Sequence, residues 1–321
     1  MTLDPEALPD LDVVIVNWNG GGLLRACLAS LAAATDAGRV QVTVVDNASA
    51  DESLRDLPAL PRPLRLIENA DNRGFGRACN QGAAGGRGPV ILFLNPDAQV
   101  APDALALARA ALLADPGSGV VGARLIDADG RTARSCARAP TSGGMLGRAL
   151  ALDRVGFVPP HFLADWDHAE DRAVDQVMGA FLMIRRDLFE RLGGFDPRFF
   201  VYYEDVDLCT RVRAAGFSVR HLAGPTARHL GQGTTRAVRA RRLFYILRSA
   251  VLYAGKHHGR AAALALLAAS FAAQVPLRLA QALARRSLSE AAEILRAAAL
   301  LAAATPAILA GLRTGARRSA G

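Results

Sequence analysis

Three carboxylates stand close together in the stretch FFVYYEDVDL, directly behind four aromatic residues. Glu204, Asp205 and Asp207 repel one another when charged, and the neighbouring rings exclude water. Both effects raise the pKa of a carboxyl group, which suits it to general-base chemistry. The same acids also fit the first turn of a helix, because DVDLCTRVRAAG has helical periodicity and ends at a glycine.

Asp97 and His229 are candidate ligands for a divalent cation. Asp97 follows the apolar run ILFLN after one proline, so its carboxylate projects from the turn beyond a strand. Mg²⁺ takes few protein ligands and completes its shell with phosphate oxygens and water, so one such carboxylate can serve it. The alternative is a turn that caps the next helix. His229 lies in the Gly/Thr-rich run PTARHLGQGTT, where we expect a loop and a second ligand, whereas His221 lies in a strand-like run and looks structural.

The elements that must position these residues alternate regularly along the first part of the chain. Short β-branched runs predict strands at residues 11–17, 40–47, 64–69, 89–95 and 119–126, and helical patterns separate them. One of those helices is expected to begin at Ser49 as its N-cap. Alternation at this spacing predicts a mostly parallel, doubly wound α/β sheet.

Polar residues follow four of the predicted strands at their carboxyl ends, where ligands bind to open α/β sheets. One polar cluster after one strand is usually a turn, but four on the same edge favour a ligand site. The clusters are Asn17 and Asn19, Asp46 and Asn47, residues 69–73, and Asn95 with Asp97.

The pattern changes after about residue 130. Residues 131–175 lack periodicity and predict loop, whereas residues 173–186 predict a long strand or a strand pair that contains Gly179. Beyond Ala237 the chain is expected to be helical to its end. We therefore predict a catalytic domain over residues 1–236 and a helical appendage over residues 237–321.

Composition and charge narrow the class of protein. Apolar residues make up 51% of the 321 residues and charged residues 21%, which argues against wholesale disorder. The four cysteines have no metal-ligand spacing, which suits a reducing compartment, and the N-terminus shows no secretory signal pattern. The net charge of +8 is uneven: residues 237–321 hold thirteen Arg or Lys and two Glu, so the first 236 residues sum to 8 − 11 = −3.

The basic tail favours anionic lipid over nucleic acid, because it is also apolar and helical. Its uncharged runs, residues 261–277 and 297–312, fall short of the roughly 20 residues that a spanning helix needs. We expect these helices to lie on a membrane surface or to pack on the catalytic domain. The alternative is a soluble appendage or a surface for homo-oligomerisation.

The glycine-rich segments exclude two common nucleotide motifs. NWNGGG and GAAGGRG match neither the dinucleotide fingerprint nor a P-loop with its Lys and Ser/Thr. NADNRGFGRACNQG is richer in ligand groups: Arg73 could meet phosphate, Gly74 allows close backbone approach, and Asn80 supplies an amide.

At these residues the sequence resembles the family 2 glycosyltransferases of the GT-A fold, and within them the bacterial rhamnosyltransferase-like branch. The matching segments, in order, are VVIVNWNG, VVDNASADES, NRGFGRACNQG, LFLNPDAQV, GAFLMIRRDLFERLGGFDPRFFVYYEDVDLCTRVRAAGF and RHLGQGTT. They cover roughly residues 12–236. Six matches in the right order are specific, although each alone is weak. The resemblance implies a Rossmann-like, mostly parallel sheet that binds a nucleoside-diphosphate sugar.

The resemblance also implies roles for individual residues. Asp46 would recognise the nucleotide base. Asp97 matches the last acid of the metal-binding DxD, whose first acid is replaced here by Asn95, and His229 matches the later metal ligand. Asp205 would be the catalytic base, with Glu204 contacting the acceptor or tuning its neighbour and with the aromatic residues lining the acceptor cleft. The implied nucleotide and donor residues are Asn17, Asn19, Asp46, Asn47, Asn72, Arg73, Gly74, Asn80, Asn95, Asp97, Gly179 and Ala180.

These roles together imply an inverting, metal-dependent glycosyltransferase that uses Mg²⁺ or Mn²⁺. The expected donor is dTDP-rhamnose, with UDP-galactofuranose or another UDP-hexose as the alternative. The expected acceptor is a lipid-linked glycan, and the expected location is the inner face of the cell membrane. A nucleotide-sugar-binding protein without turnover is the reading from a different class, and no nucleic-acid partner is expected.

Overall fold

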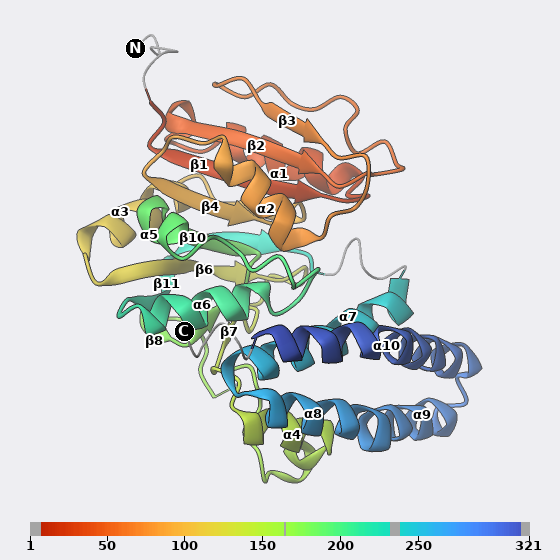
Figure 1. Cartoon of the computed structure of the whole chain (residues 1–321). Helices are drawn as coiled ribbons and strands as arrows, with labels where there is room; N and C mark the ends of the chain where they lie inside the picture. Colours follow the sequence, from red (N-terminus) through yellow and green to blue (C-terminus); the bar gives the residue numbers. More distant parts are fainter. Residues whose placement is uncertain (1–7, 164, 232–237, 316–321) are drawn as a thin grey trace. The chain divides into compact units, whose positions relative to one another are not determined.

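The chain divides into two compact units, which we describe separately. The computed structural model describes residues 8–163, 165–231 and 238–315 (Figure 1). The first unit comprises Met1–Ala139, Phe162–Pro197 and Glu204–Thr234, and the second comprises Pro140–His161, Arg198–Tyr203 and Thr235–Gly321. The domain boundary predicted after residue 236 lies outside the described residues.

The first unit is built on one large sheet whose leading half is parallel, as the sequence predicts. Three of its four strands are rich in Val, Ile and Leu and are buried on both faces, which is typical of parallel strands covered by helices, whereas the fourth, at the edge of the sheet, is partly exposed. These strands pair in the order β3, β2, β1, β4. They are β1 (Leu11–Asn17), β2 (Val40–Asp46), β3 (Arg65–Glu68) and β4 (Val90–Leu94).

The other half of the sheet continues from β4 through an antiparallel strand. β10 (Phe181–Arg185) lies between β4 and β6 (Ser118–Ile126) and is antiparallel to both. β11 (Ser218–His229) runs parallel to β6, and β5 (Ala98–Val100) pairs with the end of β11. β8 (Arg172–Val174) also pairs with β11, and β7 (Cys136–Ala137) pairs with β9 (Gln176–Val177) in a small second sheet.

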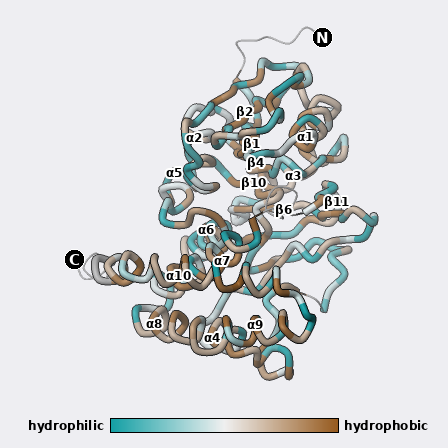
Figure 2. Tube along the Cα trace, turned by 90° about the vertical axis from the view of Figure 1, so that its right-hand side faces the viewer, coloured by the Kyte–Doolittle hydropathy of each residue, from teal (hydrophilic) through white to brown (hydrophobic). Residues whose placement is uncertain are grey.

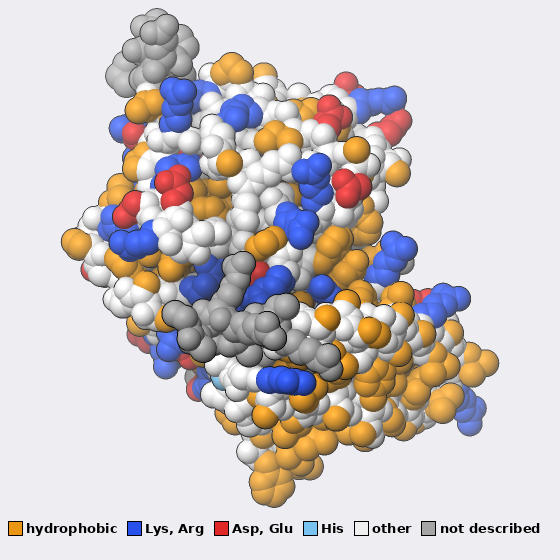
Figure 3. Space-filling view, viewed as in Figure 1, with side chains coloured by type: hydrophobic (Ala, Val, Ile, Leu, Met, Phe, Trp, Pro, Cys, Tyr) orange, Lys and Arg blue, Asp and Glu red, His pale blue; other side chains and the backbone are white. Residues whose placement is uncertain are grey.

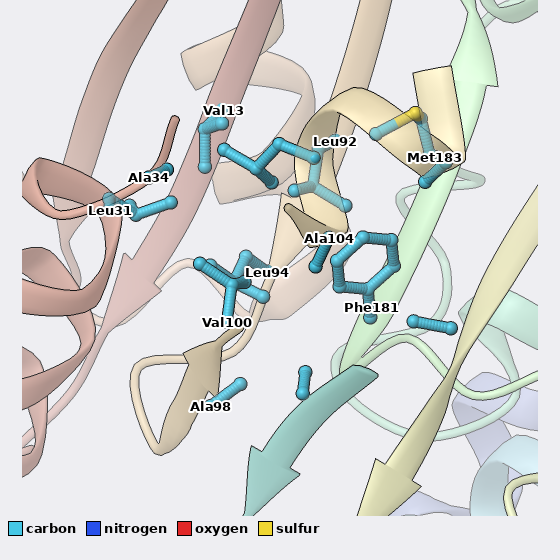
Figure 4. Packing of buried hydrophobic residues seen from close by; sticks show 14 of the residues in the cluster. Val13, Leu31, Ala34, Leu92, Leu94, Ala98, Val100, Ala104, Phe181 and Met183 are labelled. Atoms are coloured by element: carbon cyan, nitrogen blue, oxygen red, sulfur yellow. The ribbon is translucent and has the colours of Figure 1, made fainter. Parts of the chain in front are cut away.

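Helices cover both faces of the large sheet, so the doubly wound α/β prediction is confirmed. α1 (Gly22–Ala32) and α3 (Ala104–Ala114) pack on one face, where Leu92, Leu94 and Phe181 contribute to the core shown in Figure 4. On the other face lie α2 (Phe75–Ala84), α5 (Arg186–Arg191) and α6 (Glu204–Ala214). The side chains of both cores alternate along each strand, as the pleat requires.

Three sequence-based predictions of secondary structure were wrong. No helix begins at Ser49; residues 51–56 form bends and turns, because the Ser49 hydroxyl is bound to Asn17 and Asp46 and cannot cap a helix. The segment 131–175 is not all loop, since it contains α4 (Ser142–Ala149), whose N-cap Thr141 accepts from Gly144. His229 is not in a loop but is the last residue of β11.

The second unit is helical. α7 (Arg239–His257) is followed by α8 (Arg260–Ala269), a π-helical turn (Ser270–Gln274) and α9 (Val275–Ala284), and α10 (Leu288–Gly315) returns beside them. α4 packs against α8. The residues of α8 and α9 are largely hydrophobic in Figure 2. The helical prediction for the tail is therefore confirmed for its described residues.

The apolar stretches of this unit are longer than their uncharged runs in the sequence. The helical segments Arg260–Ala284 and Leu288–Leu312 each have 25 residues, with mean hydropathies of 1.6 and 1.7. By length and composition both could cross a membrane, so the length argument against spanning was wrong.

A buried histidine makes the first unit sensitive to acid. His221 is fully buried, and its Nε2 donates to the carbonyl oxygen of His168 at 3.1 Å. Burial lowers the pKa of His221 from 6.5 to about 4, because its effect exceeds that of the hydrogen bond to the His168 carbonyl oxygen, which raises the pKa. The unfolded chain therefore binds a proton more readily than the folded chain does.

We expect the stability contributed by neutral His221 to be complete above about pH 6.5 and to fall by about 3 kcal/mol as the pH approaches about 4. Urea unfolding of the parent and of His221→Phe at about pH 7 and about pH 4.5 measures this. The variant, which cannot titrate there, should lose less free energy of unfolding between the two conditions. Equal losses in both proteins would contradict the assignment.

Candidate functional site

A cluster of polar side chains lies at the carboxyl ends of β1 and β2. Asn17 and Asp46 are register partners at the ends of these strands, and Asn17 Nδ2 donates to Asp46 Oδ1 at 2.7 Å. Ser49 donates its hydroxyl to the same oxygen at 2.6 Å and its backbone N–H to Asp46 Oδ2 at 2.9 Å. Gly20 is required beside them, because a Cβ there would lie 2.4 Å from Asn17 Oδ1.

The segment after β1 is tied to the segment after β2. Asn19, whose φ is 51°, donates its backbone N–H to the Ser49 hydroxyl, and its side-chain oxygen accepts from Ala50. The structure therefore brings together Asn17, Asn19 and Asp46, as the sequence predicts. The serine that the sequence assigned to a helix cap instead joins the two loops.

A chain of hydrogen-bonded side-chain amides extends this polar cluster toward α2. Gln81 donates to Asn69, Asn69 donates to Asn47, and Asn47 donates to the carbonyl oxygen of Gly74 at 3.3 Å. Gly74 begins α2 with a φ of 84°, and Asn72 accepts from its N–H. The predicted residues Asn47, Asn72 and Gly74 thus fix the start of α2.

Arg73 is exposed to solvent. Its side chain is 50% exposed and lies 3.6 Å from Asp71, which is itself 77% exposed. An exposed ion pair of this kind contributes little free energy. The Arg73 guanidinium can therefore reorient toward an anionic ligand at little cost.

Asp97 and His229 meet at the edge of the sheet. β5 pairs antiparallel with β11 so that Ala98 is the register partner of His229, and His229 Nε2 lies 3.2 Å from Asp97 Oδ1. Asn95 Nδ2 lies 3.5 Å from the same imidazole nitrogen. β5 was not predicted from the sequence, because three residues give no periodic signal.

The two residues fit a divalent cation. Ligands on neighbouring positions of an octahedral ion lie about 3 Å apart, at metal–ligand distances of about 2.1 Å. Within the described ranges no cluster of three or more His, Cys, Asp or Glu side chains could hold a metal. A cation here would therefore have two strong protein ligands and would take the rest of its shell from phosphate and water.

A short turn connects this edge to Asp205. Between β9 and β10, the backbone N–H of Gly179 donates to Asp205 Oδ2 at 3.0 Å. The next residue, Ala180, accepts from the backbone N–H of Asn95 at 3.1 Å. The predicted strand pair around Gly179 exists, and its turn holds both the carboxylate and the Asn95–Asp97 segment.

Two opposing effects set the protonation of Asp205. Burial raises its pKa, whereas hydrogen bonds from Gly179, from Val206 and from the Gln176 side chain lower it; the net shift is upward. Gln176 is buried and belongs to β9. Gln176 was not predicted from the sequence, because its only signal there is its place three residues before Gly179.

Glu204 occupies a different environment from its neighbour. Its side chain is buried, and its Cβ lies against Gly76 of α2, where an added Cβ would come within 3.7 Å. Burial raises its pKa well above the usual range, and the charges of Asp205 and Asp207 add to this. Glu204 is therefore packed between helices within the first unit, and its contact with an acceptor stays a prediction.

Asp207 holds the loop after α5. It is fully buried and accepts from Arg211 Nε at 2.8 Å, while the other nitrogens of Arg211 donate to the carbonyl oxygens of Leu192 and Gly194. Asn80 holds the next residue of the same loop, since its amide both donates to and accepts from the backbone of Phe195 at 2.8 Å. Asn80 was predicted to bind the donor, but its amide is already used by this backbone.

The aromatic residues before Glu204 pack within the second unit. Phe200 stacks on Tyr245 of α7 with ring centroids 4.5 Å apart, and Tyr203 lies 5.5 Å from Tyr253. Phe199 is almost fully buried. The expectation that these rings line an acceptor cleft was wrong for Phe199, because a buried side chain is not available to a ligand.

Comparisons with known proteins give a consistent set of relatives. A family model described as "Glycosyl transferase family 2" matches residues 12–193, more than half of the chain, and one described as "N-terminal domain of galactosyltransferase" matches residues 161–232. The N-acetylglucosaminyl-diphospho-decaprenol L-rhamnosyltransferase of Mycobacterium tuberculosis is 30% identical over 220 residues, which are 64% of this chain and 71% of that protein. The uncharacterized protein y4gI of Sinorhizobium fredii is 29% identical over 226 residues, 66% of this chain but only 23% of its own length.

A solved structure is also similar in fold. The mannosyltransferase of Pyrobaculum calidifontis, in complex with GDP-Man and Mn²⁺, aligns with a TM-score of 0.52 at 23% identity. The alignment covers 99% of this chain and 82% of that chain. The GT-A fold expected from the sequence is therefore confirmed.

The Asp207–Arg211 pair yields a prediction about stability. Asp207→Asn leaves a mostly buried guanidinium without its counter-charge, so we expect the free energy of unfolding to fall by about 3 kcal/mol. Urea denaturation measures the change. Asp71→Asn, at an exposed ion pair, is the matched control and should change stability by less than about 0.5 kcal/mol. Similar small effects in both variants would contradict a structural role for Asp207.

Proposed function

The chain belongs to glycosyl transferase family 2, and on that premise we propose that it transfers a sugar from a nucleoside-diphosphate donor to an acceptor hydroxyl with inversion at the anomeric carbon. The observation that carries this proposal is the turn at Gly179 and Ala180. One of its backbone groups binds Asp205, and the next binds Asn95 of the segment that leads to Asp97. In a single displacement, the base and the groups that bind the leaving phosphate act at the same time. Adjacent residues that hold both would fix their relative position, which suits this mechanism.

Asp205 would act as the base. Inversion in one step needs a group that accepts the proton of the attacking hydroxyl, and it needs no covalent enzyme intermediate. The carboxylate is oriented by Gly179 and Gln176, which also keep its pKa from rising as far as burial alone would take it. The acceptor oxygen would bond to the anomeric carbon as the bond to the leaving diphosphate breaks, and its proton would pass to Asp205.

Asp97 and His229 would hold the divalent cation on the diphosphate side. The cation, when bound, neutralises charge that develops on the leaving nucleoside diphosphate. Asp46, Asn17 and Asn19 would hold the base and its pentose, with Asp46 Oδ2 and Asn17 Oδ1 as acceptors for donor groups of the nucleotide. Asn47, Asn72, Arg73, Gly74 and Asn95 would complete the donor pocket.

The proposed donor is dTDP-rhamnose, and the proposed acceptor is a lipid-linked glycan. The support is the name of the mycobacterial relative, an L-rhamnosyltransferase that acts on N-acetylglucosaminyl-diphospho-decaprenol. The mannosyltransferase of similar fold was solved with Mn²⁺, which supports the cation. A lipid-linked acceptor places the enzyme at the inner face of the cell membrane, in the synthesis of a cell-wall or surface glycan.

The role of Asp205 predicts the effects of two substitutions. Asp205→Asn should lower kcat about a hundredfold or more, because no base remains, while leaving donor binding intact. Gln176→Leu removes a hydrogen bond to the charged form of Asp205, so its pKa should rise and the acidic limb of the kcat/KM profile should move to higher pH. Initial rates across a pH series, with donor affinity measured by calorimetry, test both.

Gln176→Glu is a further test, because a second carboxylate beside Asp205 should raise the pKa of Asp205 more. The acidic limb of the kcat/KM profile should then move to still higher pH. An unchanged profile in Gln176→Leu would assign Gln176 to packing alone. Unimpaired transfer by Asp205→Asn would remove the proposed mechanism, and donor binding without transfer in the parent would favour a non-catalytic protein.

A donor screen decides the sugar and the metal. Purified protein is mixed with dTDP- and UDP-sugars and with Mg²⁺ or Mn²⁺, and nucleotide release is measured. We expect dTDP-rhamnose to give the fastest release, Mn²⁺ to exceed Mg²⁺ because one ligand is an imidazole, and chelation or Asp97→Asn to abolish release. Faster release from UDP-galactofuranose would instead select the alternative donor.

A further inference from the structure

The loop after α4 exposes large apolar side chains. It contains the 3₁₀ helix Leu152–Val155, and Val155 is 66% exposed and Phe157 81% exposed. The loop is held against α4, because Val158 packs so closely on Gly147 that a Cβ there would lie 2.4 Å away. Its apolar side chains are therefore displayed on a fixed base rather than buried.

The apolar surface continues onto the turn between α9 and α10. Arg154 in the loop donates to the side chain of Gln281 on α9, so the two segments are neighbours. Around this contact Leu283 is 56% exposed and Leu288 is 77% exposed. We call Val155, Phe157, Leu283 and Leu288 the loop–hairpin face. Exposed apolar side chains gathered on neighbouring segments mark a binding surface more often than scattered single ones do.

The charges around the loop–hairpin face are mostly positive. Arg278 lies near both Arg154 and Glu290. Arg285 pairs with Glu290 at 3.5 Å. The charged groups are Arg154, Arg278, Arg285 and Arg286 against Asp153 and Glu290, a balance of 4 − 2 = +2. Figure 3 shows Lys and Arg side chains among the hydrophobic ones over the C-terminal helices. An apolar surface edged by arginines is complementary to the headgroups and upper acyl chains of an anionic bilayer.

The packing of α10 argues against a membrane-spanning arrangement. Glu293 accepts from the backbone of Ala240 near the start of α7, and Leu312 packs on Gly255 near its end. α10 therefore runs beside α7 along nearly its whole length. α7 carries Arg239, Arg241, Arg242, Arg248 and Lys256. Spanning by α10 would draw these cations into hydrocarbon or would break the packing, and both are costly.

We propose that the loop–hairpin face inserts into the interfacial layer of an anionic bilayer, with its arginines at the headgroups and the helices lying along the surface. This goes beyond the proposed function by naming the residues that bind lipid. It also gives the enzyme a means of meeting a lipid-linked acceptor at the membrane surface. The face belongs to the second unit and the donor and base residues belong to the first, so membrane binding and sugar transfer can be measured with different variants.

Flotation of the full-length protein tests the proposal. Vesicles of phosphatidylcholine and phosphatidylglycerol in equal parts are compared with vesicles of phosphatidylcholine alone. We expect the parent to float with the anionic vesicles. Val155→Ser with Phe157→Ser should reduce partitioning at least about tenfold, because two large apolar side chains no longer enter the interface.

Leu107→Ser with Leu113→Ser is the matched control, since both leucines lie on α3 of the first unit with exposures of 42% and 44%. This pair should float like the parent. Circular dichroism and thermal midpoints establish that both double variants fold. Phe157→Trp should shift its fluorescence to shorter wavelength with anionic vesicles only, which reports insertion at that residue.

Three outcomes would overturn the proposal. The first is flotation of Val155→Ser with Phe157→Ser equal to that of the parent. The second is resistance of the bound protein to alkaline carbonate, which would mean that the helices span the bilayer. The third is a change in oligomeric state in that variant with no change in flotation, which would assign the face to a second copy of the chain. Nucleotide release with a soluble acceptor in detergent is measured separately, so loss of activity there would bear on the proposed function and not on the face.

Discussion

The turn at Gly179 and Ala180 is the constraint on which the candidate site depends. It lies between β9 and β10, and β10 is fixed in the middle of the sheet by antiparallel pairing with both β4 and β6. Two successive backbone groups of the turn then bind Asp205 on one side and Asn95 on the other. A side-chain contact could rotate away, but a backbone turn anchored by a central strand cannot, so Asp205 and the segment that leads to Asp97 keep a fixed relation.

Burial separates three acids that look alike in the sequence. Asp207 is fully buried and forms an ion pair with Arg211, which also donates to the loop after α5. Glu204 is buried against α2, and burial with the charges of its neighbours raises its pKa well above the usual range. Asp205 is partly exposed and accepts hydrogen bonds from three groups. Both features leave it able to exchange a proton. One helix turn thus contains an acid in a buried ion pair (Asp207), an acid packed against α2 (Glu204) and the candidate base (Asp205).

Local signals predicted the long elements and missed the short ones. β1, β2 and β4 are apolar runs of five to seven residues, and their boundaries agree with the prediction to within one or two residues. β5 has three residues and β9 has two, and neither has a pattern that could reveal it. Yet β5 aligns Asp97 with His229, and β9 carries Gln176. The helix predicted at Ser49 failed for a related reason, since its hydroxyl has partners on another strand rather than in a following turn.

The sequence by itself determined the class of fold, the strand ends at which polar residues gather, and the residue types able to bind a cation or accept a proton. These follow from hydrophobic periodicity and from chemistry, which are properties of short segments. Only the tertiary structure decided which residues act together: it joined Asp97 to His229, gave Asp205 its donors, and assigned Asn80 and Asp207 to holding a loop. Those assignments depend on contacts between residues up to 134 positions apart, and no local pattern encodes such contacts.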